Sequence, residues 1–183
     1  MPTIFSHAIF ATAIGSAVQF KEASFRFWLL TWLCAILPDF DVVAFVFRIE
    51  YGSMFGHRGI THSVVFAILT GSVIAWIFFR KASVARWKLA AYFAIVTVSH
   101  PLLDMFTDGG LGVALLAPFS DTRFFFPWRP IEVSPIGVDF FSDRGVAVIA
   151  SEALWIWLPS LVIAAVSWMI FQRRSRRDDT NKL

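Results

Sequence analysis

Long apolar stretches separated by short polar connections make up most of the chain. Two of them, Ile60–Phe79 and Leu89–Phe106, carry no Asp, Glu, Lys or Arg before their last few residues. Val146–Phe171 is longer, and Thr3–Phe20 is also apolar apart from one histidine and one glutamine. Roughly 20 apolar residues of helix cross a bilayer core about 30 Å thick, so the pattern predicts membrane-spanning helices.

A fifth apolar stretch, Phe25–Phe47, is long enough to span but contains a Pro-Asp-Phe-Asp sequence at residues 38–41. Proline has no backbone N–H to donate within a helix, and it biases the residue before it away from helical geometry. We therefore expect a helix up to about Leu37 and then a break. This segment is predicted to be broken or re-entrant.

The segment Thr107–Arg144 is rich in proline and contains four glycines, Gly109, Gly110, Gly112 and Gly137. Such a composition is typical of a structured loop. The sequence shows no internal repeat and no second domain. We expect a single membrane-embedded domain over residues 1–172, followed by a basic cytoplasmic tail over residues 173–183.

Composition agrees with this pattern. Hydrophobic residues make up 57% of the 183 residues and charged residues 16%, whereas soluble domains contain about 45–50% apolar and about 25% charged residues. These values exclude a disordered chain, a disulfide scaffold and an ordinary soluble enzyme. The predicted fold class is an all-α polytopic integral membrane protein with about five membrane segments and a long outer loop.

The basic residues predict the orientation. Eleven of the sixteen Lys and Arg residues lie in the connections at residues 21–26 and 80–88 and in the tail from Arg173. Because such residues are held on the cytoplasmic side, we expect an inner-membrane protein with its N-terminus outside and its C-terminus in the cytoplasm. The net charge of +3 is explained by these topology anchors and their contact with anionic lipid, so no nucleic-acid partner is expected.

All four histidines and the acids at membrane depth fall near the outer ends of the five segments. His100 and Asp104 are four residues apart and share one helix face. Asp39 and Asp41 would point together in an extended geometry after the proline. His57 is expected to reach in from a loop. The candidate ligands are His7, Asp39, Asp41, His57, His62, His100, Asp104 and Glu152.

This convergence predicts a divalent-metal site. With nitrogen and carboxylate donors alone, zinc is the leading ion, and manganese or another divalent ion is the alternative. Eight donors suffice for two ions, or for three if Asp104 bridges. Individually the residues have simpler explanations: His7 as an interfacial residue, residues 38–41 as a turn, and Glu152 as a protonated acid bonded to a neighbouring helix. Their joint occurrence favours the metal.

Arg58 lies in the same loop as His57. Its planar guanidinium is suited to two-point binding of a phosphate, and the alternative is an arginine extending to the membrane interface. Metal ions activate bound water and stabilise phosphoester displacement. The predicted catalytic residues are therefore His57, as a ligand or acid/base, and Arg58, as the phosphate contact.

Three motifs together carry a resemblance to a known family: His-Arg-Gly-Ile-Thr-His-Ser at residues 57–63, Pro-Asp-Phe-Asp at 38–41, and His-Pro-Leu-Leu-Asp at 100–104. His7 and the Pro-, Phe- and Arg-containing stretch at residues 118–128 add to it. Over residues 1–140 the sequence resembles the YdjM-type family of bacterial inner-membrane metal-dependent hydrolases, some of them under LexA (DNA-damage) control.

That family is more remotely similar to the zinc phospholipases C and related single-strand nucleases, which are helical enzymes with a three-zinc cluster. The resemblance implies that His7, Asp39 or Asp41, His62, His100 and Asp104 match the order of the ligands in those enzymes. Their second His-x-x-x-acid pair has no match here, and Glu152 is the one acid at depth that could replace it.

The sequence thus predicts a membrane-bound metal-dependent hydrolase that acts on a lipid or lipid-linked phosphoester at the outer face of the inner membrane through metal-bound water. Membrane lipids and a phosphate-bearing lipid substrate are the expected partners. The alternative is an ion or metal transporter in which the intramembrane His and acidic residues form the path. A structural metal in a binding or assembly protein is a third alternative.

Overall fold

A computed structural model describes residues 1–18, 20, 23–135 and 137–180 of the chain, with side chains described up to residue 173. The last three residues of the predicted basic tail lie outside the described residues, as do Gln19 and Lys21. Within the described part there are helices and loops and no β-strand, apart from two isolated bridges between Thr107 and Ile131 and between Val113 and Phe124. The predicted all-α class is confirmed.

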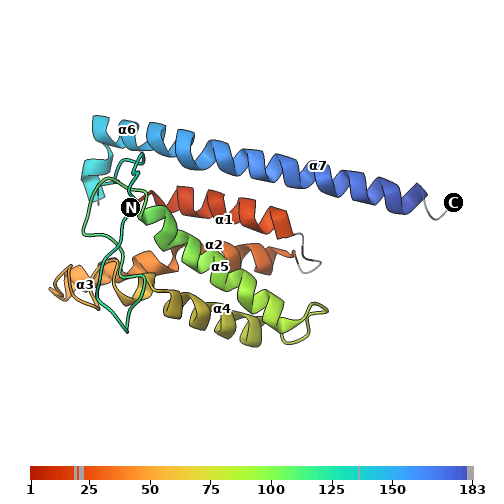
Figure 1. Cartoon of the computed structure of the whole chain (residues 1–183), viewed down its shortest axis with the longest axis horizontal. Helices are drawn as coiled ribbons and strands as arrows, with labels where there is room; N and C mark the ends of the chain where they lie inside the picture. Colours follow the sequence, from red (N-terminus) through yellow and green to blue (C-terminus); the bar gives the residue numbers. More distant parts are fainter. Residues whose placement is uncertain (19, 21–22, 136, 181–183) are drawn as a thin grey trace.

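Five helices lie side by side along one long axis (Figure 1). Short single-turn helices and loops gather at the end of the molecule where α1 begins, whereas α2 and α5 begin at the opposite end. The main helices are α1 (Ile4–Val18), α2 (Phe25–Ile36), α4 (Val64–Phe78), α5 (Arg86–Asp104) and α7 (Leu158–Thr180), with α6 (Asp143–Glu152) leading into α7 through a π-helical turn, Ala153–Trp157.

The broken segment is present but its geometry differs from the expectation. Helix α2 ends at Ile36 and continues as a 3-10 helix, Leu37–Val42, and a single turn, α3 (Val43–Val46). The expected extended geometry after Pro38 is wrong, because proline is tolerated in the first turn of a helix, where no backbone donor is needed. With about three residues per turn, residues 39 and 41 leave the backbone on different sides of the helix, although one carboxylate oxygen of each still lies within 4.8 Å of the other.

Close packing of α4 against α5 depends on small residues. A Cβ atom on Gly71 would lie 2.4 Å from the carbonyl oxygen of Ala90 and 2.5 Å from the backbone nitrogen of Ala94. Only glycine permits this approach, which is the way that membrane helices commonly pack. Phe27 of α2 also stacks on Tyr92 of α5, with ring centroids 4.9 Å apart. These contacts hold α2, α4 and α5 together.

Among the described residues, two helices are long and apolar enough to cross a membrane. They are Phe25–Val46 and the continuous helix Asp143–Arg173, whereas Ile4–Val18 and Val64–Phe78 are apolar but shorter. Fifteen helical residues extend about 22 Å, less than the bilayer core of about 30 Å. The structure therefore supports the membrane-protein class but not the predicted count of five spans.

The predicted loop, Thr107–Arg144, is a folded cover over the end of the bundle that contains the 3-10 helix Gly137–Phe140 and becomes α-helical at Asp143. Arg123 fixes it by donating from Nη1 to the carbonyl oxygen of His57 at 3.1 Å and from Nη2 to those of Tyr51 and Ser53 at 3.0 and 3.1 Å. Burial lowers the pKa of the Arg123 guanidinium below its ordinary value. The loop is thus tied to the segment that carries the histidine motif.

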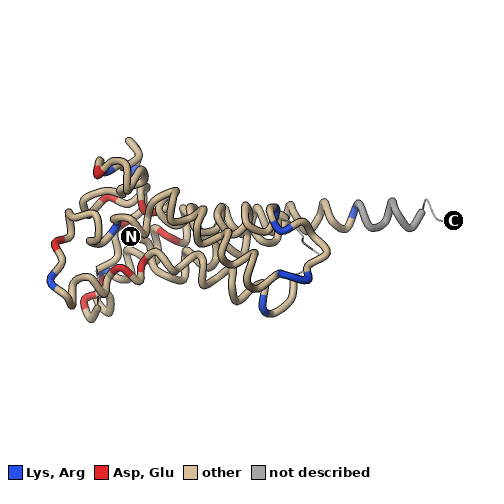
Figure 2. The backbone as a smooth tube through the Cα atoms, turned by 90° about the horizontal axis from the view of Figure 1, so that it is seen from below, with Lys and Arg blue, Asp and Glu red and all other residues tan. Residues whose placement is uncertain are grey.

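Charge is distributed unevenly along the long axis (Figure 2). The acidic residues that Figure 2 colours, up to residue 173, gather at the end that holds the loops, together with some basic residues, and the coloured charges at the opposite end are basic. The helices between the two ends show neither kind. The molecule therefore has a mixed end, an uncharged middle and a basic end.

Candidate metal centre

Four side chains meet inside the mixed end of the molecule. Asp39 comes from the 3-10 helix after α2, His62 from the short helix Ile60–His62, and His100 and Asp104 from the last turns of α5. All four are buried, and one ligand atom from each lies within 4.8 Å of the other three. The closest pair is His100 Nε2 and Asp39 Oδ1 at 3.3 Å. The structure thus brings together four of the predicted ligands.

The polar atoms of this cluster lack hydrogen-bond partners. Both carboxylate oxygens of Asp39 and of Asp104, and Nε2 of His62 and of His100, are buried with no partner. A buried polar group left unsatisfied costs about 1–3 kcal/mol, and more when charged. Two carboxylates and two imidazoles facing one point match the donor set that divalent transition metals bind. The residues therefore fit a metal ion.

Hydrogen bonds at the other ring nitrogen orient both histidines. Nδ1 of His100 lies 2.7 Å from the carbonyl oxygen of Ala35. Nδ1 of His62 is hydrogen-bonded to the hydroxyl of Thr61 at 3.1 Å and also lies 3.1 Å from Oδ2 of Asp41. Each contact turns the Nε2 atom of its ring toward the cluster, which is how outer-shell partners orient histidine ligands in metal sites.

Asp41 lies beside the cluster and is fully engaged. Its Oδ1 is 2.5 Å from Nδ1 of His57, while Oδ2 accepts the backbone N–H of Arg58 at 3.0 Å and the hydroxyl of Thr61 at 2.7 Å. Asp41 thereby organises the whole segment from His57 to His62. Asp39, Asp41 and His57 also form a second group whose ligand atoms lie within 4.8 Å of one another.

His7 reaches the cluster from α1. Its ring stacks on that of His100, with centroids 3.7 Å apart and planes 16° apart. Its Nε2 lies 3.6 Å from Oδ1 of Asp104, and both ring nitrogens are buried without a hydrogen-bond partner. The first helix therefore contributes a further free donor at the edge of the site.

Arg58 is 1% exposed and points inward. Its Nε lies 3.1 Å from Oδ2 of Asp104, Nη1 donates to the carbonyl oxygen of Gly109 at 3.0 Å, and Nη2 donates to the hydroxyl of Thr107 at 3.2 Å. Its backbone has φ of 60°, a conformation uncommon for a residue with a side chain. Arg58 thus binds Asp104 to the loop, and its predicted contact with phosphate stays a prediction.

The structure places Glu152 away from the four-residue cluster. Oε1 accepts the backbone N–H of Thr3 at 2.6 Å, and Oε2 accepts the hydroxyls of Thr3, at 2.6 Å, and Ser6. Trp157 donates to the same Ser6 hydroxyl at 2.7 Å. Glu152 therefore fastens the end of α6 to the start of α1.

Sequence reasoning missed three residues around the site. Thr61 bridges Asp41 and His62, Thr107 fixes Arg58, and Arg123 ties the loop to the histidine segment. Thr61 lies inside the motif at residues 57–63, so its position between two histidines was a usable signal. Thr107 and Arg123 act through contacts across more than 40 residues of sequence, which no local pattern reveals.

Comparison with known proteins assigns the chain to a family. The family model described as YdjM inner membrane protein matches residues 1–176. The chain belongs to the YdjM inner membrane protein family. The resemblance given by the motifs is therefore confirmed, and the match extends beyond residue 140 into the last helix.

One relative in this family is the inner membrane protein YbcI of Escherichia coli (strain K12), which is 38% identical over 172 residues, covering 92% of this chain and 98% of that protein. No solved structure matches the chain. Membership of the YdjM family supports location in the inner membrane, and neither description names a reaction.

Proposed function

We propose that this chain is a membrane-embedded, metal-dependent hydrolase that cleaves a lipid or lipid-linked phosphoester at the outer face of the inner membrane. The observation that carries the proposal is the set of buried ligand atoms on Asp39, His62, His100 and Asp104, which form no hydrogen bond and of which one from each residue lies within 4.8 Å of the other three. A divalent metal held by three of these four residues, with one position open, would lower the pKa of a water bound there and so supply a nucleophile at neutral pH.

Zinc is the proposed ion, since imidazole nitrogens and carboxylate oxygens are among its ordinary ligands, and manganese is the alternative. The sequence predicts two or three ions. The hydrogen bonds favour one well-formed site, because Asp41 and His57 of the second group already bind each other. His7, with its free ring nitrogens beside Asp104, is the residue placed to add a fifth donor or to move a proton.

The surface around the site supports a lipid substrate. Large apolar side chains at the same end are strongly exposed: Phe119 is 86% exposed, Phe141 88% and Val138 83%. Exposed apolar side chains on loops at the end of a membrane bundle favour contact with the lipid interface. A phosphoester carried by a lipid headgroup would then lie at the depth of the site.

We further propose the five-segment topology, with α1, α2, α4, α5 and α7 crossing the membrane or entering it deeply and the basic end in the cytoplasm. These helices lie side by side and run in alternating directions, and charge is separated along their axis; both observations support this topology (Figures 1 and 2). The shorter helices α1 and α4 would require local thinning of the bilayer or extension of their ends by flanking residues.

The transporter alternative receives less support. A path for ions or protons requires polar or ionisable groups at several depths. The stretches Ala8–Val18, Val64–Phe78, Leu89–Ser99 and Ala153–Gln172 contain no Asp, Glu, His, Lys or Arg. The candidate ligands are thus confined to one end of the bundle.

Metal content per chain, measured by elemental mass spectrometry on detergent-purified protein, tests the proposal. We expect about one zinc per chain in the wild type, from the single four-donor set, and its loss in His100→Ala and Asp104→Ala. Asp121→Asn is the control, because this exposed acid lies in the loop outside the cluster. Size-exclusion chromatography checks that each variant is folded.

A folded wild type that holds no metal would overturn the proposal. If the metal is present, hydrolysis of phospholipids in mixed micelles separates a catalytic ion from a structural one. A wild type with bound zinc and no phosphoester hydrolysis, across lipid classes, would leave the metal with a structural role.

A further inference from the structure

A second polar site lies at the opposite, basic end of the molecule. A cavity of about 660 Å³ opens there between the start of α2, the end of α4 and the loop that follows α4. It lies at the end of the bundle where α2 and α5 begin, opposite the end where α5 finishes and the loops gather (Figure 1). It therefore takes no part in the proposed hydrolase site.

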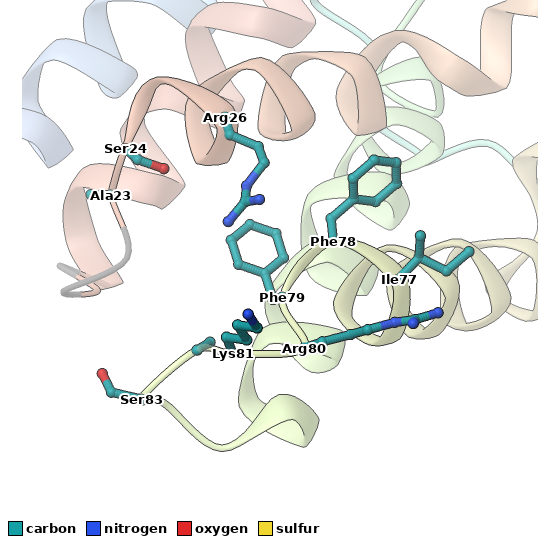
Figure 3. Close-up of a pocket in the computed structure, with 10 residues that line it drawn as sticks. Ala23, Ser24, Arg26, Ile77, Phe78, Phe79, Arg80, Lys81 and Ser83 are labelled. Atoms are coloured by element: carbon teal, nitrogen blue, oxygen red, sulfur yellow. The ribbon is translucent and has the colours of Figure 1, made fainter.

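The chemistry of the cavity wall is cationic on one side and apolar on the other. Arg26, Arg80 and Lys81 line it together with Ile77, Phe78 and Phe79, and none of the ten described lining residues is acidic. Figure 3 shows Arg26 extending from α2 toward the ring of Phe79, with Lys81 beyond that ring and Arg80 directed along the rim. The guanidinium carbon of Arg26 is 5.2 Å from the centroid of the Phe79 ring.

The apolar side continues onto the outer surface of α4. Ile77 is 52% exposed and Phe78 43%, whereas Phe79 is 2% exposed and forms the floor. Half-exposed apolar side chains next to lysine and arginine are typical of the boundary between headgroups and acyl chains. A ligand here would meet cations at its head and apolar side chains along its tail.

We infer that this cavity binds the phosphate of an anionic phospholipid, with the headgroup in contact with Arg26 and Lys81 at the edge of the Phe79 ring and an acyl chain along Ile77 and Phe78. Charge complementarity identifies the headgroup, since basic pockets between membrane helices bind anionic lipid headgroups. Continuity with the exposed face of α4 identifies the lipid rather than a soluble phosphate as the ligand. The inference does not depend on the proposed hydrolase activity.

Native mass spectrometry of the full chain in detergent tests this site, with phosphatidylglycerol and phosphatidylcholine as the added lipids. We compare the wild type with the double variant Arg26→Gln/Lys81→Gln. The matched control is Arg86→Gln/Lys88→Gln, which removes the same charge at the same end. Its two cations lie over Trp76 and Trp87, at 5.6 Å from each ring, and do not line the cavity.

We expect the wild type to retain phosphatidylglycerol in preference to phosphatidylcholine, and the cavity variant to lose affinity for it by about fivefold per charge removed. The control variant should bind as the wild type does. Equal losses in both variants would show a diffuse surface attraction and overturn the site. Displacement of the lipid by inorganic phosphate at similar concentration would overturn the lipid as its ligand.

Discussion

Asp39 and Asp41 are two residues apart and have the same functional group, yet their surroundings give them different roles. Both oxygens of Asp39 are buried without a hydrogen-bond partner. Those of Asp41 bind His57, Thr61 and the backbone of Arg58. A free carboxylate is available to a metal, whereas a saturated one orients the groups around it. The chemistry of each acid is thus decided by the 3-10 turn that carries it.

Replacement of Asp41 by Asn is expected to weaken metal binding without changing the number of ions. The amide has one acceptor oxygen, so it cannot hold both His57 and Thr61 as the carboxylate does, and outer-shell substitutions of this kind cost about 10–100-fold in metal affinity. Competition with a chromophoric chelator measures the affinity. Asp39→Asn is the comparison, and we expect it to remove the ion.

An Asp41→Asn protein that loses a whole ion per chain would contradict this assignment. It would show that Asp41 is a direct ligand, as the second group of Asp39, Asp41 and His57 permits. Asp121→Asn, an exposed acid in the loop, should leave the affinity unchanged. The three variants together therefore separate ligand, orienting residue and bystander.

At the residue scale the sequence was informative where spacing is local. The four-residue spacing of His100 and Asp104 predicts one shared face, and their side chains do approach each other, with Nε2 and Oδ2 4.0 Å apart. Arg58 shows the limit of this reasoning, because its partners Thr107 and Gly109 lie about fifty residues further along the chain. Nothing in its local pattern distinguishes an inward arginine from one that faces a substrate.

At the scale of elements, the junction between α1 and the last helix depends on one buried acid. Glu152 ends α6, accepts three hydrogen bonds from Thr3 and Ser6, and is followed directly by the π-helical turn. The N–H groups at the start of a helix lack partners within it, and a carboxylate there is stabilised by the helix dipole. The junction holds His7, three residues into α1, against α5.

Substitution of Glu152 by Gln is expected to destabilise the protein and leave its metal content unchanged. The amide NH₂ of Gln would face groups of Thr3 and Ser6 that donate hydrogen bonds to Glu152. The loss of buried hydrogen bonds to a charged group costs about 1.5–3 kcal/mol. Thermal unfolding followed by intrinsic fluorescence measures the first effect and elemental analysis the second. Glu132→Gln is the control, since that acid is exposed. Loss of metal at unchanged stability would instead make Glu152 a ligand, as the sequence predicts.

The sequence patterns predicted the positions of the elements well, but they predicted the lengths of the helices less well. The break near Leu37 and the loop from Thr107 agree with the structure, because proline and glycine act locally. The apolar stretches Thr3–Phe20 and Ile60–Phe79 yield helices of only 15 residues each. In the second case, His62 and Ser63 belong to the site and to the helix cap rather than to the helix, so hydropathy alone overestimates the span.

At the scale of the whole molecule, the chain is polarised along its axis. The candidate ligands lie at one end, and Arg26, Lys81, Arg86 and Lys88 lie at the other, where α2 and α5 begin. Charged side chains are costly inside a bilayer, and here they lie at the two ends, whereas the helices between carry no charge. Each end must therefore face water or headgroups. This polarity connects the two proposed sites: hydrolysis at one membrane face and lipid binding at the other.

The polarity predicts that the two ends lie on opposite sides of the membrane. Cys34 is buried in α2, so Cys34→Ala gives a background for single cysteines at Asp121, in the loop over the candidate metal centre, and at Ala85, which caps α5 at the basic end. With the positive end held in the cytoplasm, a membrane-impermeant maleimide should label Asp121→Cys in intact spheroplasts. It should label Ala85→Cys only after permeabilisation. The reverse pattern would place the candidate metal centre in the cytoplasm and exclude an outer-leaflet substrate. Labelling of both sites from one side would exclude a bundle that crosses the bilayer, and with it a metal centre and a lipid pocket on opposite faces.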